Sequence, residues 1–196
     1  DKTVVRILKD NSTLERLKDD APSDAESLAR RAEIDAGKLT DALWGEGYYN
    51  ASVDVLVAGR AVRAGDLASA VAAARAMMGR QVVPVTIRAV PGERFTLRNL
   101  TVITPSGARL DEIPRRELGV EPGEPARAES VRAAQARVVD WYREQSRPLT
   151  KPVDILATVD HGARVMDATI VVAPGAVAPI GEIAVSGAPG VDPAGI

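Results

Sequence analysis

Few residues in this 196-residue chain could carry out catalysis. His161 is the only histidine and there is no cysteine, so disulfides, thiolate zinc sites and cysteine nucleophiles are excluded. No G-x-S-x-G, Walker A or G-x-G-x-x-G pattern occurs, which also removes an activated serine and the usual phosphate-binding loops. Because His161 lies in the turn-like sequence HGAR, we expect a solvated turn residue and not a general base or metal ligand.

Two pairs of adjacent acids, Asp19-Asp20 and Asp111-Glu112, are the remaining groups that could do acid–base chemistry. Both pairs lie next to expected helix ends, where carboxylates are solvated or interact favourably with the helix dipole. We therefore predict no catalytic residue, no metal site and no cofactor, and we expect a protein that is not an enzyme.

Composition limits the partners and the kind of core. Hydrophobic residues make up 45% of the chain and aromatic residues only 3%, so the core must consist of Val, Ile, Leu and Ala in one or two compact domains. The formal net charge is −2. Nucleic-acid binding calls for a basic face and usually for stacking aromatics, so we expect no nucleic-acid partner.

The spacing of apolar residues indicates which elements would position these groups. Apolar positions from Ala25 to Leu43 recur every three and four residues, which predicts a long helix that Gly45 and Gly47 end. We place Tyr48 and Tyr49 where this helix turns into a strand. The first half should then contain a strand at 2–9, this helix, a strand at 52–57, an alanine-rich helix at 67–77 and a strand within VPVTIRAVPG.

The second half shows the same order of patterns. RFTLRNLTVIT predicts a strand with a bulge at Asn99, where the alternation of apolar residues slips. A short helix at 110–118 and a longer one through Val131, Val138 and Tyr142 should follow. PVDILATVD and DATIVVAPG then predict a hairpin around HGAR, and IGEIAVSG predicts one more strand.

The two halves also match in sequence. VDVL at 53–56 corresponds to VDIL at 153–156, and TIRAVPG at 86–92 corresponds to TIVVAPG at 169–175. A hairpin alone cannot hide its apolar side, so each copy should be a small α+β module. We expect tandem modules of order strand-helix-helix-strand-strand, each with two helices packed on a three-stranded sheet. The expected boundaries are 1–92 with an alanine-rich helical insertion near 59–82, 93–175, and 176–196 as the start of a third module.

Four segments carry a resemblance to a known family: ALWGEGYYNASVDV, VPGERFTLRNLTV, GVEPGEPARAESV and PGAVAPIGEIAVSG. In their order and duplication they resemble the polypeptide-transport-associated (POTRA) repeats of bacterial outer-membrane protein assembly factors, most closely those of the TamA subunits of translocation and assembly modules. The resemblance covers nearly the whole chain. In the second copy, Arg147 and Pro148 stand where the first copy has Gly47 and Tyr48.

The resemblance implies a periplasmic scaffold attached to the outer membrane through a C-terminal barrel outside this sequence. Its partners would be unfolded outer-membrane or secreted client polypeptides and a periplasmic or inner-membrane protein. It further implies that the second strand of each module is an exposed edge to which such chains add by β-augmentation. The expected partner-binding residues are Ser52, Val53, Asp54, Val55, Leu56 and Val57 in the first module and Val153, Asp154, Ile155, Leu156, Ala157 and Thr158 in the second.

Other functions remain open at this stage. The chain could belong to a related factor, such as the main barrel-assembly subunit or a two-partner secretion transporter. It could also be the targeting arm of a larger envelope enzyme. A third alternative is an envelope ligand- or glycan-binding module that uses Trp44, Tyr48 and Tyr49, although tyrosines beside a helix end favour a packing role.

Overall fold

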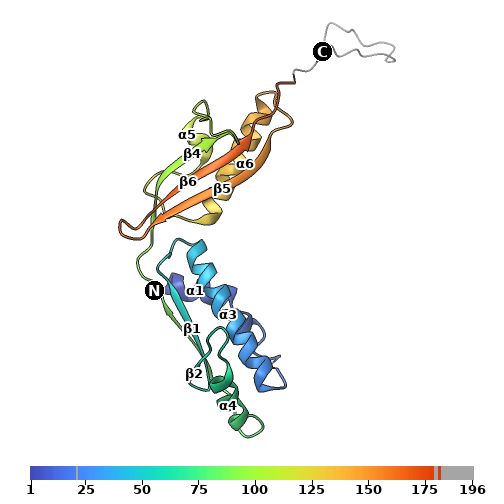
Figure 1. Cartoon of the computed structure of the whole chain (residues 1–196), viewed down its shortest axis with the longest axis vertical. Coiled ribbons are helices and arrows are strands. Elements are labelled where there is room, and N and C mark those ends of the chain that lie inside the picture. Colours follow the sequence, from blue (N-terminus) through green and yellow to red (C-terminus); the bar gives the residue numbers. More distant parts are fainter. Residues whose placement is uncertain (21, 179–180, 182–196) are drawn as a thin grey trace, which may run out of the picture.

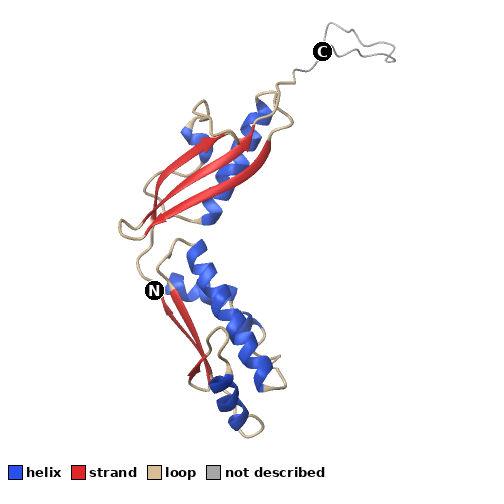
Figure 2. Ribbon diagram, viewed as in Figure 1, coloured by secondary structure: helices blue, strands red, loops and turns tan. Residues whose placement is uncertain are grey.

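The computed structural model describes residues 1–20, 22–178 and 181. The chain folds into two halves that lie end to end, each with helices covering one face of a sheet (Figures 1 and 2). The two three-stranded sheets are separate. The predicted α+β class, with helices packed on three-stranded sheets, is therefore confirmed.

The first half contains helices α1 (Lys2–Asn11), α2 (Thr13–Arg16), α3 (Ala25–Gly45) and α4 (Ala68–Met77), and strands β1 (Ser52–Val57), β2 (Arg60–Ala61) and β3 (Val85–Val90). The second half contains strands β4 (Thr96–Ile103), β5 (Lys151–Asp160) and β6 (Val165–Ala173), and helices α5 (Arg115–Leu118) and α6 (Ala128–Glu144). The expected order strand-helix-helix-strand-strand is present in the second half, whereas the first half begins with a helix.

The strand expected at 2–9 is wrong, because these residues form α1. Val4 and Ile7 lie three residues apart on one helix face, and both are buried in a cluster with Leu43 of α3. The Asp1 carboxylate accepts a hydrogen bond from the Thr3 N–H at 2.8 Å and caps the helix. A short apolar run fits both periods, and here packing against α3 selected the helical one.

A buried carboxylate holds α2 onto α3. Asp35 is fully buried, and its side chain accepts hydrogen bonds from Ser12 Oγ (2.6 Å), Thr13 N (2.7 Å) and Leu14 N (3.2 Å). Thr13 and Leu14 open α2, so the carboxylate satisfies backbone N–H groups that have no partner within the helix. This one acidic side chain therefore fixes the position of the start of α2 against α3.

A tight hairpin decides the order of the first sheet. Ala58 and Gly59 both have positive φ (49° and 76°), as a two-residue turn with mirror-image geometry requires. The turn folds β2 back along the end of β1, and Leu56 pairs with Ala61. The sheet order is β2-β1-β3, with β1 and β3 antiparallel. The strand β1 therefore lies inside its sheet, and β3 forms an edge.

The second sheet has the order β4-β6-β5. The strand β4 runs parallel to β6, and β5 runs antiparallel to it, as the predicted hairpin requires. The register of β4 shifts between Leu97 and Asn99, which confirms the predicted bulge. Apolar residues of α6, including Val131, Val138 and Tyr142, pack on the inner face of this sheet. On the outer face, Thr101 and Thr169 share a hydrogen bond of 3.0 Å.

An ion pair on this outer face makes stability depend on pH. Hydrogen bonds from Arg98 and then Asn99 hold the pKa of Asp167 below its ordinary value. Because the pKa is lower in the folded chain than in the unfolded chain, this carboxylate stabilises the fold above about pH 4. The contribution is lost as the pH falls through the folded-state pKa.

We predict that Arg98→Ala raises the pKa of Asp167 toward its ordinary value, as an NMR titration of the carboxyl carbon would measure. The matched control is Arg109→Ala, because Arg109 pairs with Asp111 instead. The control should leave the Asp167 midpoint unchanged. An Asp167 midpoint that does not move in Arg98→Ala would contradict this account of the pKa.

None of the helices in the described ranges is long and apolar enough to cross a membrane. The strand predicted for IGEIAVSG lies outside the described residues, apart from Gly181.

Candidate functional site

The strand β5 presents a free edge along the second half. It pairs with β6 only, so the backbone on its other side has no strand partner among the described residues. Val153 and Leu156 on this strand are each 53% exposed. An unpaired strand with exposed apolar side chains can accept an additional strand from another polypeptide.

A groove runs between this edge and α6. One hollow of about 250 Å³ is lined by α6 residues, including Arg132, Gln135 and Val139, and by Pro152 of β5. A second hollow of about 280 Å³ continues past Arg132 to Ile155 and Ala157 and ends at Tyr49 of the first half. Arg132 lines both hollows, so they lie next to each other beside the strand edge.

The start of the β5 edge is partly closed by the chain itself, because the Ile155 N–H donates to the Asp154 carboxylate at 2.8 Å. The Gln135 side chain donates to the Asp154 carbonyl at 2.9 Å and so connects α6 to β5. Pro152 has no N–H to donate, and the register shifts between Pro152 and Asp154. An added strand would therefore pair beyond the bulge, from Leu156 onward.

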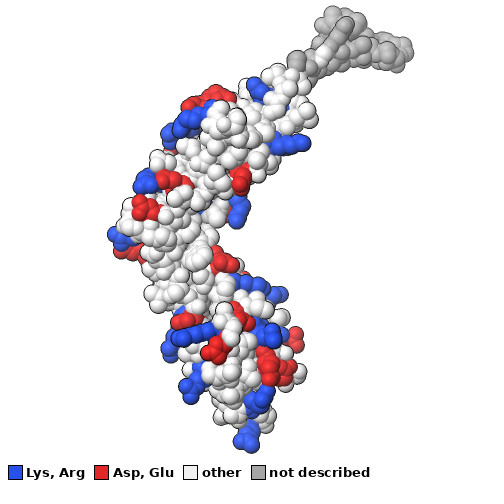
Figure 3. All heavy atoms as spheres, viewed as in Figure 1, with Lys and Arg blue, Asp and Glu red and all other residues white. Residues whose placement is uncertain are grey.

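Basic side chains line the helical wall of the groove. Arg132 lies 3.8 Å from Glu129, and Arg143 lies 3.4 Å from Asp140, and all four side chains are at least half exposed. Such exposed ion pairs contribute about 0–1 kcal/mol, so either arginine can exchange its partner for a carboxylate of a ligand at little cost. Over the face seen in Figure 3, basic and acidic side chains alternate without forming a large basic region.

The corresponding expectation for the first half is partly wrong. The strand β1 was expected to be an exposed edge, but Val55, Leu56 and Val57 are buried, and β2 covers the end of the strand. The Val62 N–H also donates to the Val55 carbonyl at 2.9 Å. Among the described residues, only the stretch from Ser52 to Asp54 has no strand partner on the side of β1 that faces away from β3. The tight turn at Ala58 and Gly59 is the physical reason.

The stretch from Gly47 to Asn50 joins the two halves. Gly47 has φ +91°, and a Cβ atom there would lie 3.2 Å from the Ala126 carbonyl oxygen. The Phe95 N–H donates to the Gly47 carbonyl at 2.8 Å, and the Tyr49 hydroxyl donates to the Ala126 carbonyl at 3.0 Å. Burial raises the pKa of Tyr49, which keeps its hydroxyl protonated as a donor.

Charged and aromatic side chains surround this junction. Glu46 pairs with Arg94 at 2.8 Å and with Arg127 at 3.2 Å, and Arg94 lies over the Tyr48 ring, 5.4 Å from its centre. His161 is exposed in a turn as predicted, but its Nδ1 also lies 2.7 Å from the Asn50 side-chain oxygen. His161 therefore connects the halves.

The positions of the tyrosines at this junction argue against the glycan-binding alternative. Tyr48 is 6% exposed and Tyr49 donates across the junction, so neither ring is free to stack on a sugar, whereas Trp44 is 43% exposed. Sequence reasoning missed the junction residues Glu46, Arg94 and Arg127. They come from segments far apart in the chain, and no periodicity brings such residues together. In the described residues, no group of three or more acids and histidines is placed to hold a metal ion.

No protein-family model and no curated protein sequence matches the chain. Among solved structures it is similar to POTRA3-5 of BamA from Haemophilus influenzae, with 16% identity over 74% of this chain and 50% of that one, and a TM-score of 0.40. It is also similar to POTRA4 of the same BamA, with 13% identity, coverages of 43% and 95%, and a TM-score of 0.32.

A third similar structure is POTRA1-2 of the periplasmic domain of Omp85 from Anabaena, with 13% identity, coverages of 81% and 89%, and a TM-score of 0.41. The chain thus spans half the length of the BamA POTRA3-5 structure. These identities and TM-scores are too low to assign it to the family of any of the three.

Proposed function

We propose that this chain is a pair of POTRA modules that serves as a non-enzymatic periplasmic scaffold in outer-membrane protein assembly, and that it binds extended client polypeptides by β-augmentation at β5. The free β5 edge beside the α6 groove is the observation that carries the proposal. A backbone edge selects for an extended conformation and not for one sequence, which suits a protein that handles many unfolded clients.

The groove adds a preference for certain side chains. An added strand would direct alternate residues toward α6, where Val131, Val139 and Ile155 line apolar hollows. Arg132 and Arg143 would face acidic residues or a terminal carboxylate of the client. The proposed ligand is therefore an extended segment of alternating apolar and polar residues, as in the strands of an outer-membrane barrel.

The finer parts of the proposal rest on the sequence resemblance. They are membership of the TamA group, attachment to the outer membrane through a C-terminal barrel, and contact with a periplasmic or inner-membrane partner protein. The proposed modules are 1–92 and 93–175, with 176–196 opening a third. Two separate sheets, one within each of the first two ranges, are consistent with that division.

The test is a proline placed at an outward-facing N–H of β5. Ile155 donates its N–H to the Asp154 side chain, so this group points away from β6. Ala157, two residues on, points its N–H to the same side because backbone groups alternate along an antiparallel strand. Ala157→Pro therefore removes a donor from the free edge while the ladder to β6 stays intact.

We expect Ala157→Pro to weaken the affinity for a labelled barrel-strand peptide about tenfold, because a hydrogen bond is lost and the proline ring obstructs pairing. Fluorescence anisotropy would measure the affinity, and circular dichroism would confirm a native fold. Ala157→Ser is the matched control, since it keeps the N–H. Equal peptide affinity of the proline variant and the native chain would refute β-augmentation at β5.

A further inference from the structure

Part of the inner face of the first sheet is left uncovered. Val85 of β3 is 37% exposed, and Ile87 is only partly buried. Their counterparts in the second half are Ala168 and Ile170, because TIRAVPG and TIVVAPG correspond, and these two residues are 1% and 0% exposed. The first half therefore leaves apolar side chains in contact with water where the second half buries them, and burying them in a ligand would be favourable.

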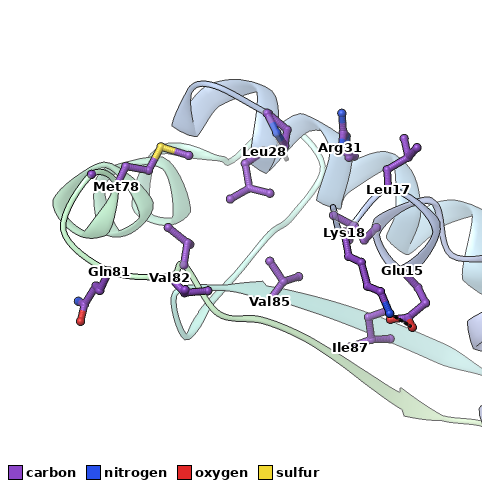
Figure 4. Close-up of a pocket in the computed structure, with 14 residues that line it drawn as sticks. Glu15, Leu17, Lys18, Leu28, Arg31, Met78, Gln81, Val82, Val85 and Ile87 are labelled. Carbon is purple, nitrogen blue, oxygen red and sulfur yellow. Dashed lines mark hydrogen bonds and ion pairs between the residues drawn. The ribbon is translucent and has the colours of Figure 1, made fainter. Parts of the chain in front are cut away.

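A groove of about 520 Å³, here called the α3–β3 groove, lies over these side chains (Figure 4). Helices α2 and α3 form one wall, and β3 together with the turn after α4 forms the other. Small-molecule sites occupy about 300–1,000 Å³, so the volume suits such a ligand. The apolar side chains that line the groove are leucine, valine, isoleucine, methionine and proline, with no aromatic ring among them.

The α3–β3 groove has an apolar end and a charged end (Figure 4). Met78 and Val82 lie at the apolar end, whereas Glu15 and Lys18 lie at the other, joined by an ion pair of 3.5 Å. Val85 lies between the two ends. Because a charged group is costly to bury and a hydrocarbon is not, this division fits a molecule with an apolar tail and a charged head.

The charged lining residues favour a negatively charged head. They are Lys18, Arg31 and Glu15, so two cations stand against one carboxylate. The Lys18–Glu15 pair is largely exposed and therefore weak, which leaves Lys18 able to exchange its partner. Arg31 donates to the backbone carbonyl of Asp20 at 2.8 Å, a contact that does not neutralise its charge. A carboxylate can accept hydrogen bonds from both cations.

An occupant of the α3–β3 groove contacts the face of the sheet and not its edge. The side chains of Val85 and Ile87 stand roughly perpendicular to the sheet, whereas the backbone N–H and C=O groups of β3 lie in its plane. A polypeptide in the groove would bury backbone amides against aliphatic side chains that offer no hydrogen bond, which is costly. A hydrocarbon chain has no polar group to satisfy, so it suits this surface better.

We propose that the α3–β3 groove binds a fatty acid, with the acyl chain against Leu28, Met78 and Val85. The carboxylate lies at the charged end, near Lys18 and Arg31. Met78 is unbranched and flexible, so the apolar end can adjust to acyl chains of different lengths. The acyl chain covers the inner face of β3, as the side chains of the second core cover that of β6. This site is separate from the proposed peptide-binding edge, and neither depends on the other.

Isothermal titration calorimetry with the sodium salts of octanoic, decanoic and dodecanoic acid, each below its micelle concentration, tests the proposal. We expect each addition of two methylenes to raise the affinity about tenfold, because every buried methylene adds a similar free energy. Dodecyltrimethylammonium has the same tail with a cationic head. It should bind at least about threefold more weakly than dodecanoate, because Lys18 and Arg31 repel it.

Four variants locate the site. Val85→Asp should weaken dodecanoate binding at least about tenfold, because it places a carboxylate against the acyl chain. Its matched control is Thr86→Asp, which adds the same charge at an exposed position on the opposite face of β3. The double variant Lys18→Gln/Arg31→Gln should remove the preference for dodecanoate over the cationic amphiphile. Arg30→Gln changes an exposed arginine of α3 outside the groove lining and should keep that preference. Circular dichroism verifies the fold of each variant.

Three results would overturn the proposal. One is equal dodecanoate affinity of Val85→Asp and Thr86→Asp, and another is an affinity that does not change with chain length. The third is a barrel-strand peptide that binds more weakly to Val85→Asp while dodecanoate does not bind the unchanged chain, since the occupant would then be a polypeptide. Ala157→Pro should leave dodecanoate binding unchanged, so a failure of β-augmentation at β5 is distinguishable from a failure of this site.

Discussion

Replacing Asp35 by alanine should lower the free energy of unfolding by about 3 kcal/mol, because three donors lose their acceptor in a buried site. Two of those donors are backbone N–H groups at the start of α2, which have no partner within the helix. We expect α2 to detach from α3 before the rest of the half unfolds. Urea unfolding followed by circular dichroism measures the loss, and amide hydrogen exchange locates it.

Two further variants make this prediction specific. Asp41→Ala removes an exposed carboxylate from the same helix and should change the unfolding free energy by no more than about 0.5 kcal/mol. Combining Ser12→Ala with Asp35→Ala should cost less than the sum of the single changes, because both remove the same hydrogen bond. Equal losses for Asp35→Ala and Asp41→Ala would show that the buried carboxylate does not anchor α2.

Replacing Gly47 by valine should be similarly costly, at about 3 kcal/mol. A β-branched residue at φ +91° is strained, and its Cβ atom would approach the Ala126 carbonyl oxygen at 3.2 Å. That carbonyl belongs to the backbone and is already bonded to the Tyr49 hydroxyl, so it cannot easily move away. Denaturant unfolding would report the stability, and small-angle X-ray scattering would report the arrangement of the two halves.

The same substitution two residues earlier is the matched control. Gly45 ends α3, and a Cβ atom there would meet no atom within 4 Å. Gly45→Val should therefore change stability little, since valine and glycine have comparable helix propensities. If Gly47→Val is no more destabilising than Gly45→Val, the close contact at the junction does not hold the halves together.

Two strand edges, β5 and β3, have no strand partner among the described residues. The β5 edge has a groove beside it that is open to varied side chains, and its bulge at Val153 limits where a strand can pair. The β3 edge borders a larger, mostly apolar groove. The two edges belong to different sheets, so a substitution at one leaves the other unchanged.

Regular local patterns were enough to predict most elements. The helical spacing from Ala25 to Leu43 predicted α3, and the slip in alternation at Asn99 predicted the bulge in β4. The duplicated VDVL and VDIL segments predicted two modules of the same order, but the two sheets differ, because β2 pairs with β1 in the first and β4 pairs with β6 in the second. Such features depend on neighbours within a few residues of each other, which is why a sequence can reveal them.

Packing between distant residues decided the rest. Lys2 to Asn11 became a helix because Val4 and Ile7 are buried against α3, although the same letters also suit a strand. The strand β1 lost its free edge because the turn at Ala58 and Gly59 folds β2 over its end. The strand β3 is an edge because Lys2 to Asn11 form a helix and not the expected strand. The sequence by itself determined the α+β class, the repeat and the absence of cysteine chemistry. Only the tertiary structure decided which edges are free and what joins the halves, because both depend on contacts between residues that no local pattern relates.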